Sequence, residues 1–355
     1  MITLERLQTV LAQFSKLSIG LVGDLFLDRY LELDDDLHEL SIETGLEAYQ
    51  ITRIRNSPGA LGTIMNNLAA LGVGRMTPVT VLGDDGQAYD LSRALASMPV
   101  DQSHIIRDPA RLTPTYTKPL RRAPKGGWAE LNRLDLRNCA PLGAETEAKL
   151  LAELTAVFDA TDGLIVLDQV NEEGWGVIGP AVREHLAKLA ARSPDKLMFI
   201  DSRAHIAQFR CGTLKPNVHE CLAALGAKSK QGVPDAVPTI EASTEAARRF
   251  AELTGCPLYC TMSERGMLVV EADATGGAGG KTTVAAGYQV HGPIDPVGAG
   301  DSATAGIVSA LLAGATRVEA AAVGNLTASI TVQQLGTTGT ATPAQLVARW
   351  QETHG

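Results

Sequence analysis

The chain has 355 residues, of which 45% are hydrophobic and 20% are charged, and this composition is that of a folded globular protein rather than a disordered one. Its 31 Lys and Arg residues against 40 Asp and Glu residues give a net charge of -9. This charge argues against a nucleic acid or an anionic membrane as the main partner, because both would be repelled. It leaves room for a small anionic substrate held by a few local cations.

The cysteines and the N-terminus bear on the compartment. The five cysteines are odd in number and lack paired metal-ligand spacing, with Cys256 and Cys260 in CPLYC as the nearest approach to a ligand pair. The first ten residues contain Glu5 and Arg6 in place of the apolar core of a signal peptide. The apolar runs within the uncharged stretch 320–348 are far shorter than the ~20 residues needed to cross a bilayer. We therefore expect a reduced cytoplasmic protein with no membrane partner.

Short apolar runs alternate with helical patterns along most of the chain, as in βα units around a mostly parallel sheet. The predicted strands and helices lie at 17–24, 65–72, 76–86, 88–97, about 143–159, 163–168, about 175–192, 196–201 and 257–262. The Gly-rich segment 274–281 predicts a hairpin loop. Segments 30–56 and 105–137 instead alternate polar and apolar residues, which is typical of exposed antiparallel strands. We predict one α/β domain over 1–355, with a doubly wound, mostly parallel sheet flanked by helices and a small β-sheet lid built from those two segments.

The most informative segment is 291–316. Gly298, Ala299 and Gly300 leave backbone amides uncovered, and Asp301 stands at the expected N-cap of an apolar helix. Uncovered amides at a helix N-terminus form an anion-binding site. A carboxylate fits there if it accepts the proton of a hydroxyl that attacks a phosphate. The alternative is that Asp301 only caps a buried helix; the loop is not a Walker A loop, because the GK[ST] ending is missing.

This segment resembles the signature of the ribokinase (phosphofructokinase-B) family of carbohydrate kinases, and four further elements follow in the family's order. The five elements are Gly23-Asp24 with Asp28, Pro58-Gly59 through Gly72, the KPNxxE match at 215–220, the TxGxxG match at 261–266, and Asp295 through Ser302. Five ordered matches over about residues 19–340 are far more specific than any one of them.

The resemblance implies ATP-dependent phosphoryl transfer to a hydroxyl of a sugar or sugar phosphate. It makes Asp301 the catalytic base, beside the amides of Gly298, Ala299 and Gly300. The residues that it places around the sugar are Asp24, Asp28, Gly59 and Thr63.

The same resemblance implies a nucleotide site and two cation sites. Around the phosphates of ATP it places Asn217, Glu220, Thr261, Ser263 and Gly266, with Asn325 as a weaker candidate near the adenine. Glu220 would hold Mg²⁺ through water. Asp295, with the loop 332–338, would hold a monovalent cation such as K⁺.

Within the family, the sequence looks most like the D-glycero-β-D-manno-heptose-7-phosphate kinases. The resemblance lies in GDLFLDRY (23–30), in PTYTKPLRR with LNRLDL (114–122 and 131–136), and in QLGTTGTAT (334–342). It makes Lys118, Arg121, Arg122 and Arg133 candidates for binding a phosphate already on the sugar, because a dianion needs cationic partners. The alternative is that these four side chains lie on a solvated strand.

The sequence departs from the family's motifs in three places, and the change in the glycine motif bears on the substrate. The family's glycine motif usually reads GGAANVA, but here Ala60 follows Gly59, Leu61 replaces a small residue and Thr63 replaces the sugar-binding Asn. Ser263 replaces the middle Gly of TxGxxG, and the Tyr-Gly-Lys-Gly run after the central strand of heptose kinases is absent. A kinase of an unphosphorylated sugar or nucleoside, and a diverged non-catalytic sugar- or nucleotide-binding protein, remain alternatives. Because lid strands in this family often pair across a two-fold axis, a homodimer is expected.

Overall fold

The computed structural model describes residues 2–37, 39–123, 126–227, 238–272 and 278–354. Its centre is a nine-stranded sheet in the order β16-β15-β14-β13-β12-β11-β1-β6-β7. The strands from β14 to β7 are parallel, while β15 and β16 are antiparallel to their neighbours. Their bounds are β1 Ser18–Gly23, β6 Arg75–Leu82, β7 Ile105–Arg107, β11 Gly163–Asp168, β12 Leu197–Ser202, β13 Thr213–Leu214, β14 Leu258–Thr261, β15 Gly266–Ala272 and β16 Ala278–Ala286. Of the predicted hairpin loop at 274–281, residues 274–277 lie outside the described residues, and 278–281 belong to β16 rather than to a loop.

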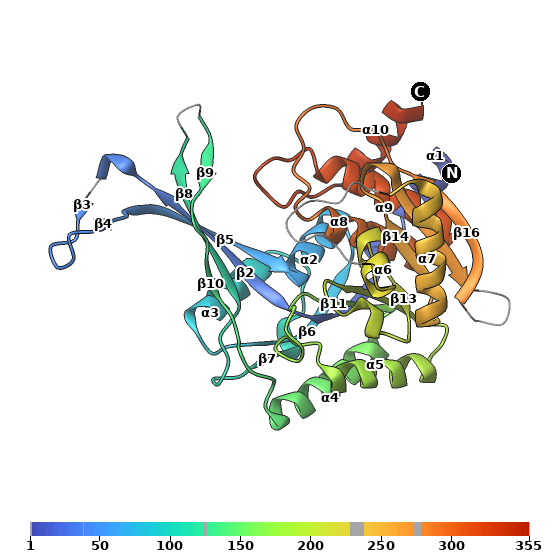
Figure 1. Cartoon of the computed structure of the whole chain (residues 1–355), viewed down its shortest axis with the longest axis horizontal. Coiled ribbons are helices and arrows are strands. Elements are labelled where there is room, and N and C mark those ends of the chain that lie inside the picture. Colours follow the sequence, from blue (N-terminus) through green and yellow to red (C-terminus); the bar gives the residue numbers. More distant parts are fainter. Residues whose placement is uncertain (1, 38, 124–125, 228–237, 273–277, 355) are drawn as a thin grey trace.

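Helices cover both faces of this sheet (Figure 1). One face packs against α1 Leu4–Leu11, α2 Leu61–Ala70, α3 Gly86–Leu95, α8 Ala299–Leu312, α9 Arg317–Thr331 and α10 Pro343–His354. The other face packs against α4 Ala144–Ala160, α5 Pro180–Arg192, α6 Val218–Ala224 and α7 Ile240–Thr254. The prediction of a doubly wound α/β fold is confirmed.

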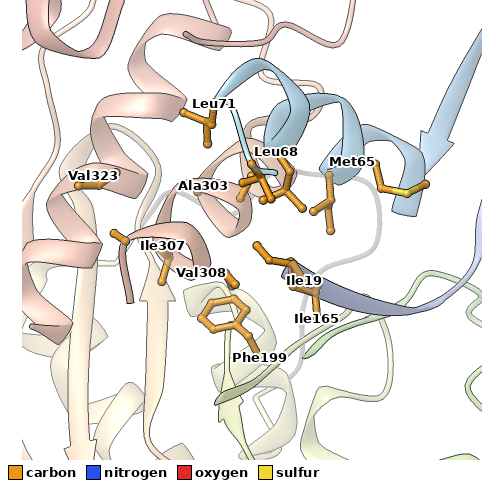
Figure 2. Packing of buried hydrophobic residues seen from close by; sticks show 14 of the residues in the cluster. Ile19, Met65, Leu68, Leu71, Ile165, Phe199, Ala303, Ile307, Val308 and Val323 are labelled. Carbon is orange, nitrogen blue, oxygen red and sulfur yellow. The ribbon is translucent and has the colours of Figure 1, made fainter. Parts of the chain in front are cut away.

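Alternate residues of each central strand belong to two different hydrophobic clusters. In β11, Ile165 belongs to the cluster under α2 and α8, while Leu164 and Val166 belong to the cluster under α4 and α5. A parallel strand needs apolar residues on both faces because helices cover both, which is why these strands read as continuous apolar runs. Figure 2 shows the first cluster, where Ile165 and Phe199 of the sheet meet Leu68 of α2 and Ile307 of α8.

Local signals set several helix ends. Asp85 caps α3 by accepting a hydrogen bond from the Ala88 N–H at 2.8 Å. Helix α5 begins at Pro180, with Gly179 as its N-cap, and not near 175 as the sequence pattern indicated. Proline is favoured at the first position of a helix because the N–H it lacks would be unpaired there. The segment before it is therefore a loop, and that loop lines the pocket described below.

A smaller sheet leaves the main body and carries a projecting two-stranded hairpin (Figure 1). Its order is β10-β8-β2-β5, with β9 paired to β8. The bounds are β2 Leu25–Leu33, β5 Ile51–Ala60, β8 Thr115–Arg122, β9 Trp128–Glu130 and β10 Leu134–Leu136, with the hairpin formed by β3 Glu39–Leu40 and β4 Glu47–Ala48. Segments 30–56 and 105–137 supply much of this sheet, although the latter begins with β7, which pairs with β6 at the edge of the large sheet.

Three further observations concern the described residues as a whole. Within it, no helix combines the length and the apolar character needed to span a bilayer. All five cysteines are free thiols, and the Sγ atoms of Cys221 and Cys260 lie 3.8 Å apart in the core. The described residues contain no group of three or more His, Cys, Asp or Glu side chains arranged to hold a metal ion.

Candidate active site

The Gly298–Asp301 loop opens helix α8 at the carboxyl edge of the large sheet. Gly298 is the N-cap and has φ 79°, a backbone conformation that glycine adopts without strain. Its carbonyl accepts the first intrahelical bond, from the Ser302 N–H at 2.9 Å, and among the described residues no side chain caps the helix end. The N–H groups of Gly300 and Asp301 therefore lie at an uncapped N-terminus. The expectation that Asp301 is the N-cap was wrong: it stands in the first turn, because the positive φ of Gly298 starts the helix earlier.

Four charged side chains gather beside this loop. The Nζ of Lys215 lies 2.8 Å from Oδ2 of Asp201, and only 5% of Lys215 is exposed. A Cβ added to Gly300 would lie 3.5 Å from the same Nζ. The lysine therefore directly contacts the Gly298–Asp301 loop, which we call the amide loop. Asp301 and Glu220 act electrostatically on Lys215 and complete the group. Asp201, the last residue of a predicted buried strand, was missed as a site residue, although ligands bind at the carboxyl ends of such strands.

The charged cluster shifts the protonation equilibria of its own members. Burial, with the Asp201 carboxylate next in effect, raises the pKa of Asp301 to about 7. Burial and Asp201 likewise raise the pKa of Glu220 to about 7. Burial alone would lower the pKa of Lys215, but Asp201, Glu220 and Asp301 together outweigh it and the pKa is raised. Lys215 therefore stays a cation beside Asp301 and Glu220, whose pKa values both lie near neutrality.

The KPNxxE and TxGxxG elements lie side by side. The Thr261 N–H donates to the Pro216 carbonyl at 3.0 Å, which joins the end of β14 to the start of α6. Asn217 caps α6 by accepting from the Glu220 N–H at 2.9 Å, and the Glu220 carboxylate accepts from the Asn217 N–H at 2.7 Å. This reciprocal capping box fixes both side chains at the helix start.

Gly266 closes the TxGxxG turn at a place where no side chain fits. Its φ is 90°, and a Cβ there would lie 2.2 Å from the Ala285 carbonyl oxygen of β16. Asn325 of α9 contacts the same strand: its Nδ2 donates to the carbonyls of Ala285 and Ala286 at 2.9 and 3.1 Å. The amide of Asn325 is thus committed to holding α9 against β16.

Asp295 joins the segment before α8 to the loop 332–338. Its carboxylate accepts from the Val297 N–H at 3.1 Å and from the Gly336 N–H at 3.0 Å. Its own N–H donates to the Val332 carbonyl at 2.7 Å. The structure therefore brings together the two segments named for the monovalent cation.

Asp24 lies between the two sheets and is fully engaged by backbone amides. Oδ2 accepts from the N–H groups of Gln169 and Val170 at 2.8 and 3.2 Å, and Oδ1 accepts from the Val177 N–H at 2.7 Å. Burial raises the pKa of Asp24 despite these bonds. Its two oxygens hold the loop 169–177 in place.

Asp28 pairs with one of the four candidate lid cations. The Nζ of Lys118 lies 3.0 Å from Oδ1 of Asp28 and donates to the Tyr30 hydroxyl at 3.3 Å. A Cβ on Gly59 would lie 2.6 Å from Oδ2 of Asp28, so the glycine leaves room for this carboxylate. Thr63 is buried elsewhere: its Cγ2 would lie 3.4 Å from a Cβ on Gly298. Thr63 therefore contacts the amide loop.

The other three candidate cations do not gather at one point. Arg121 pairs with Asp35 at 2.9 Å and with Glu47 at 3.2 Å, on the outer part of the small sheet. Arg122 stacks over the Trp128 ring at 4.7 Å. Arg133 lies over the Tyr116 ring at 4.1 Å and makes two hydrogen bonds to Asp135. Of these three, Arg133 alone lines the pocket that lies between the sheets.

That pocket has a volume of about 220 Å³ and is lined by residues of both sheets and of the loop 169–177. Asp24 lines this pocket together with four arginines: Arg111, Arg133, Arg137 and Arg203. Three of these arginines were not predicted as site residues. Their signal in the sequence is weak, because they come from loops whose positions depend on the tertiary fold.

The comparison with known families identifies the fold and its chemistry. Residues 34–345 match the family described as pfkB family carbohydrate kinase. The chain belongs to this family. It is therefore a sugar kinase, as the motifs predicted.

Two curated relatives match nearly the whole chain. The bifunctional protein HldE of Trichlorobacter lovleyi is 28% identical over 97% of this chain and 65% of its own length. The protein of the same name from Pelobacter propionicus is 30% identical over 92% of this chain and 62% of its own length. The chain thus spans 62–65% of the length of these relatives.

Solved structures support the same fold. Phosphofructokinase-2 from Escherichia coli in complex with potassium has a TM-score of 0.67 at 16% identity and covers 96% of this chain and 100% of its own. Arabidopsis thaliana ribokinase complexed with ribose and ATP has a TM-score of 0.65 at 15% identity and covers 94% and 98%. At these identities the likeness establishes the ribokinase-like fold.

Two departures from the pfkB motifs leave measurable backbone strain. Ser263 and Ala60 have φ values of 54° and 53° and are the only non-glycine residues with positive φ in the described ranges. Both stand where the family motifs have glycine. We expect Ser263→Gly and Ala60→Gly each to raise the free energy of unfolding by about 1 kcal/mol, because glycine adopts positive φ without a Cβ clash. Urea denaturation measures this.

A matched control separates strain relief from any general effect of glycine. Ala94 lies in ordinary helical conformation in α3, so Ala94→Gly should lower the free energy of unfolding by about 1 kcal/mol. If all three substitutions destabilise alike, the positive φ values carry no strain.

Proposed function

We propose that the protein transfers the γ-phosphoryl group of ATP to a hydroxyl of a heptose-phosphate-like sugar, with Asp301 as the catalytic base. One observation carries the proposal: Asp301 stands in the first turn of an uncapped helix N-terminus and beside Lys215, with a pKa raised by burial to about 7. A base works best when its pKa lies near the working pH. Phosphoryl transfer requires positioning and charge stabilisation more than covalent chemistry.

The residues of the amide loop and of the charged cluster have different roles in the proposed phosphoryl transfer. Asp301 accepts the proton of the acceptor hydroxyl as the hydroxyl oxygen attacks the γ-phosphorus, and the bond from the γ-phosphorus to the bridging oxygen breaks to release ADP. The N–H groups of Gly300 and Asp301 donate to the transferring phosphoryl group, where negative charge develops. Lys215, held by Asp201 at 2.8 Å, adds a fixed positive charge at this point. Gly298 and Ala299 shape the loop that presents these donors.

The nucleotide side is formed by Asn217, Glu220, Thr261, Ser263 and Gly266, whose two elements are joined at Pro216. Asn325 supports this side by holding β16 in place. Mg²⁺ would be held by Glu220 through water, since Mg²⁺ usually takes one or two carboxylates together with substrate phosphates. One oxygen of Glu220 is used in the capping box, which leaves the other for a hydrated ion. Bound Mg²⁺ supplies charge neutralisation between the phosphates.

Glu220→Gln tests the magnesium assignment. A glutamine oxygen can still accept from the Asn217 N–H, so the capping box and the fold should persist. We expect turnover to fall at low Mg²⁺ and the Mg²⁺ concentration for half-maximal rate to rise about tenfold. Titrating Mg²⁺ in steady-state assays measures this. A loss of turnover that does not change with Mg²⁺ would assign Glu220 a purely structural role.

The acceptor is proposed to lie in the pocket between the sheets. Four arginines in its wall favour an acceptor that carries an anionic group over a neutral sugar or nucleoside. Asp28, Lys118, Gly59 and Arg133 are proposed to contact the sugar from the small sheet. Asp24 would act by holding the loop 169–177, since its two oxygens are already engaged.

Two further assignments belong to the same proposal. Asp295 and the loop 332–338 would hold a K⁺ ion near the amide loop. The bound ion would fix the conformation of the amide loop. The protein would act as a cytoplasmic homodimer joined through the small sheet and its projecting hairpin, because apolar side chains are exposed on and around them: Leu37, Leu40, Ile42, Leu46, Tyr49, Ile54, Trp128 and Leu134. Sedimentation equilibrium would test the dimer.

A coupled ADP-release screen tests the proposed function. ATP and Mg²⁺ are supplied with paired acceptors, each sugar being offered with and without its phosphate. We expect acceptor-dependent ADP release that is highest with a heptose 7-phosphate. Release with a neutral sugar or nucleoside alone would favour the alternative kinase assignment, and no acceptor-dependent release would favour a non-catalytic binding protein.

A further inference from the structure

The pocket arginines differ in what already holds them. Arg133 makes bidentate hydrogen bonds to Asp135 at 2.7 and 2.8 Å. Arg137 pairs with Glu172 at 2.5 Å. Arg111 donates to the carbonyls of residues 140 and 175 at 2.5 and 2.7 Å. An incoming anion would have to compete with a carboxylate for Arg133 and Arg137, which lowers the gain from binding.

Arg203 is the exception among the four. Its side chain is exposed to the pocket, and within the described residues it has neither an ion pair nor a side-chain hydrogen bond. Its charge reaches Tyr116 in the pocket wall and Glu220 in the charged cluster, where it acts to lower both pKa values. Arg203 thus lies between the acceptor pocket and the phosphoryl-transfer site with its donors free.

The backbone that carries Arg203 is held firmly. The Arg203 N–H donates to the Asp168 carbonyl at 2.9 Å. The Ser202 hydroxyl donates to the Asp168 carboxylate at 2.7 Å and accepts from the His205 N–H at 3.0 Å. The His205 ring lies 3.1 Å from the same carboxylate. A free guanidinium on a fixed turn loses little backbone entropy when it binds an anion.

We propose that Arg203 is the specificity-determining residue for the acceptor and binds the phosphate monoester that the acceptor already carries. The inference rests on the proposed function and names the residue that distinguishes a phosphorylated acceptor from a neutral one. A guanidinium offers two parallel N–H donors to a phosphate, and a dianion in a partly closed pocket needs such a partner. Lys118 and Arg121, by contrast, are already neutralised by carboxylates.

The test compares Arg203→Gln with Arg203→Lys and uses D-glycero-D-manno-heptose 7-phosphate and the same heptose without phosphate. Calorimetry gives the affinity for each, and steady-state assays give KM for the acceptor and for ATP. We expect Arg203→Gln to weaken binding of the heptose 7-phosphate by tenfold or more, with Arg203→Lys in between. Affinity for the unphosphorylated heptose and KM for ATP should stay within twofold of the wild type.

Arg210→Gln is the matched control, since Arg210 follows on the same segment but lies outside the pocket and bonds to the carbonyls of Ala207 and Phe209. It should change neither affinity. The inference is overturned if Arg203→Gln keeps the preference for the phosphorylated heptose, or if KM for ATP rises in its place. The inference is also overturned if the wild type binds the heptose no better with phosphate than without it, or binds neither form. In that case, ADP release that depends on another sugar as acceptor would still support the proposed kinase function.

Discussion

Asp301→Asn should lower kcat by about 10² to 10⁴ while KM for ATP stays nearly unchanged, because a positioned base is worth that much in proton transfer. An amide keeps the size of the side chain but cannot accept the proton of the acceptor hydroxyl at neutral pH. Stopped-flow or coupled ADP-release assays at saturating acceptor measure the change. Turnover close to the wild type would remove Asp301 from the role of base.

The pH dependence follows from the same residue. Since burial raises the pKa of Asp301 to about 7, log kcat/KM of the wild type should rise with pH up to about 7 and then level off. This limb should vanish in Asp301→Asn. A carboxyl whose pKa is raised by folding contributes its full stabilisation at a pH below its pKa in the unfolded chain. This stabilisation is lost as the pH rises through the pKa in the folded protein. The melting temperature of Asp301→Asn should therefore be higher than that of the wild type at pH 8, and the difference should be smaller at pH 5.

Lys215→Met should cost both stability and activity. Lys215 is 5% exposed and pairs with Asp201 at 2.8 Å, and breaking a buried pair from one side typically costs about 3–5 kcal/mol. We expect kcat to fall at least tenfold. The acidic limb of the pH profile should move to higher pH, because Lys215 acts to lower the pKa of Asp301. Urea denaturation and pH profiles measure these effects.

The double variant Asp201→Asn/Lys215→Met is the control. Neutralising Asp201 removes the unpaired carboxylate, so the double variant should regain a large part of the lost stability but not the lost turnover. If Lys215→Met alone leaves the free energy of unfolding unchanged, the pair carries no structural weight. In that case the lysine would serve only the chemistry.

The large sheet was predictable because its strands are buried on both faces and read as apolar runs. The run 163–168 coincides with β11, and 196–201 differs from β12 by one residue at each end. Helix ends were less predictable: the start of α5 depends on Gly179 and Pro180, which periodicity does not register. The edge strand β7 was assigned to the lid because a three-residue strand has too few positions to show a period.

In the candidate site too, some features could be predicted from the sequence and others could not. The capping box at Glu220, the tight turn at Gly266 and the presence of a helix start near Asp301 were predictable because each is local, although the N-cap is Gly298 and not Asp301. The surroundings of Asp24 were not, since its carboxylate accepts from amides 145 to 153 residues away. The four lid cations were expected to converge on a phosphate. Lys118 and Arg121 instead pair with carboxylates from distant segments that no spacing rule predicts. Arg122 and Arg133 are held by Trp128 and Asp135, which lie nearby in the sequence.

The central claim is that Asp301 drives phosphoryl transfer to a sugar hydroxyl, and ³¹P NMR of the reaction tests it most directly. The wild type and Asp301→Asn are incubated with ATP, Mg²⁺ and a heptose 7-phosphate, and the products are followed together. The account predicts a new sugar phosphate resonance that grows in equal amount with ADP in the wild type and at least a hundredfold more slowly in the variant. ADP that forms with inorganic phosphate alone, or at equal rates in both proteins, would contradict it.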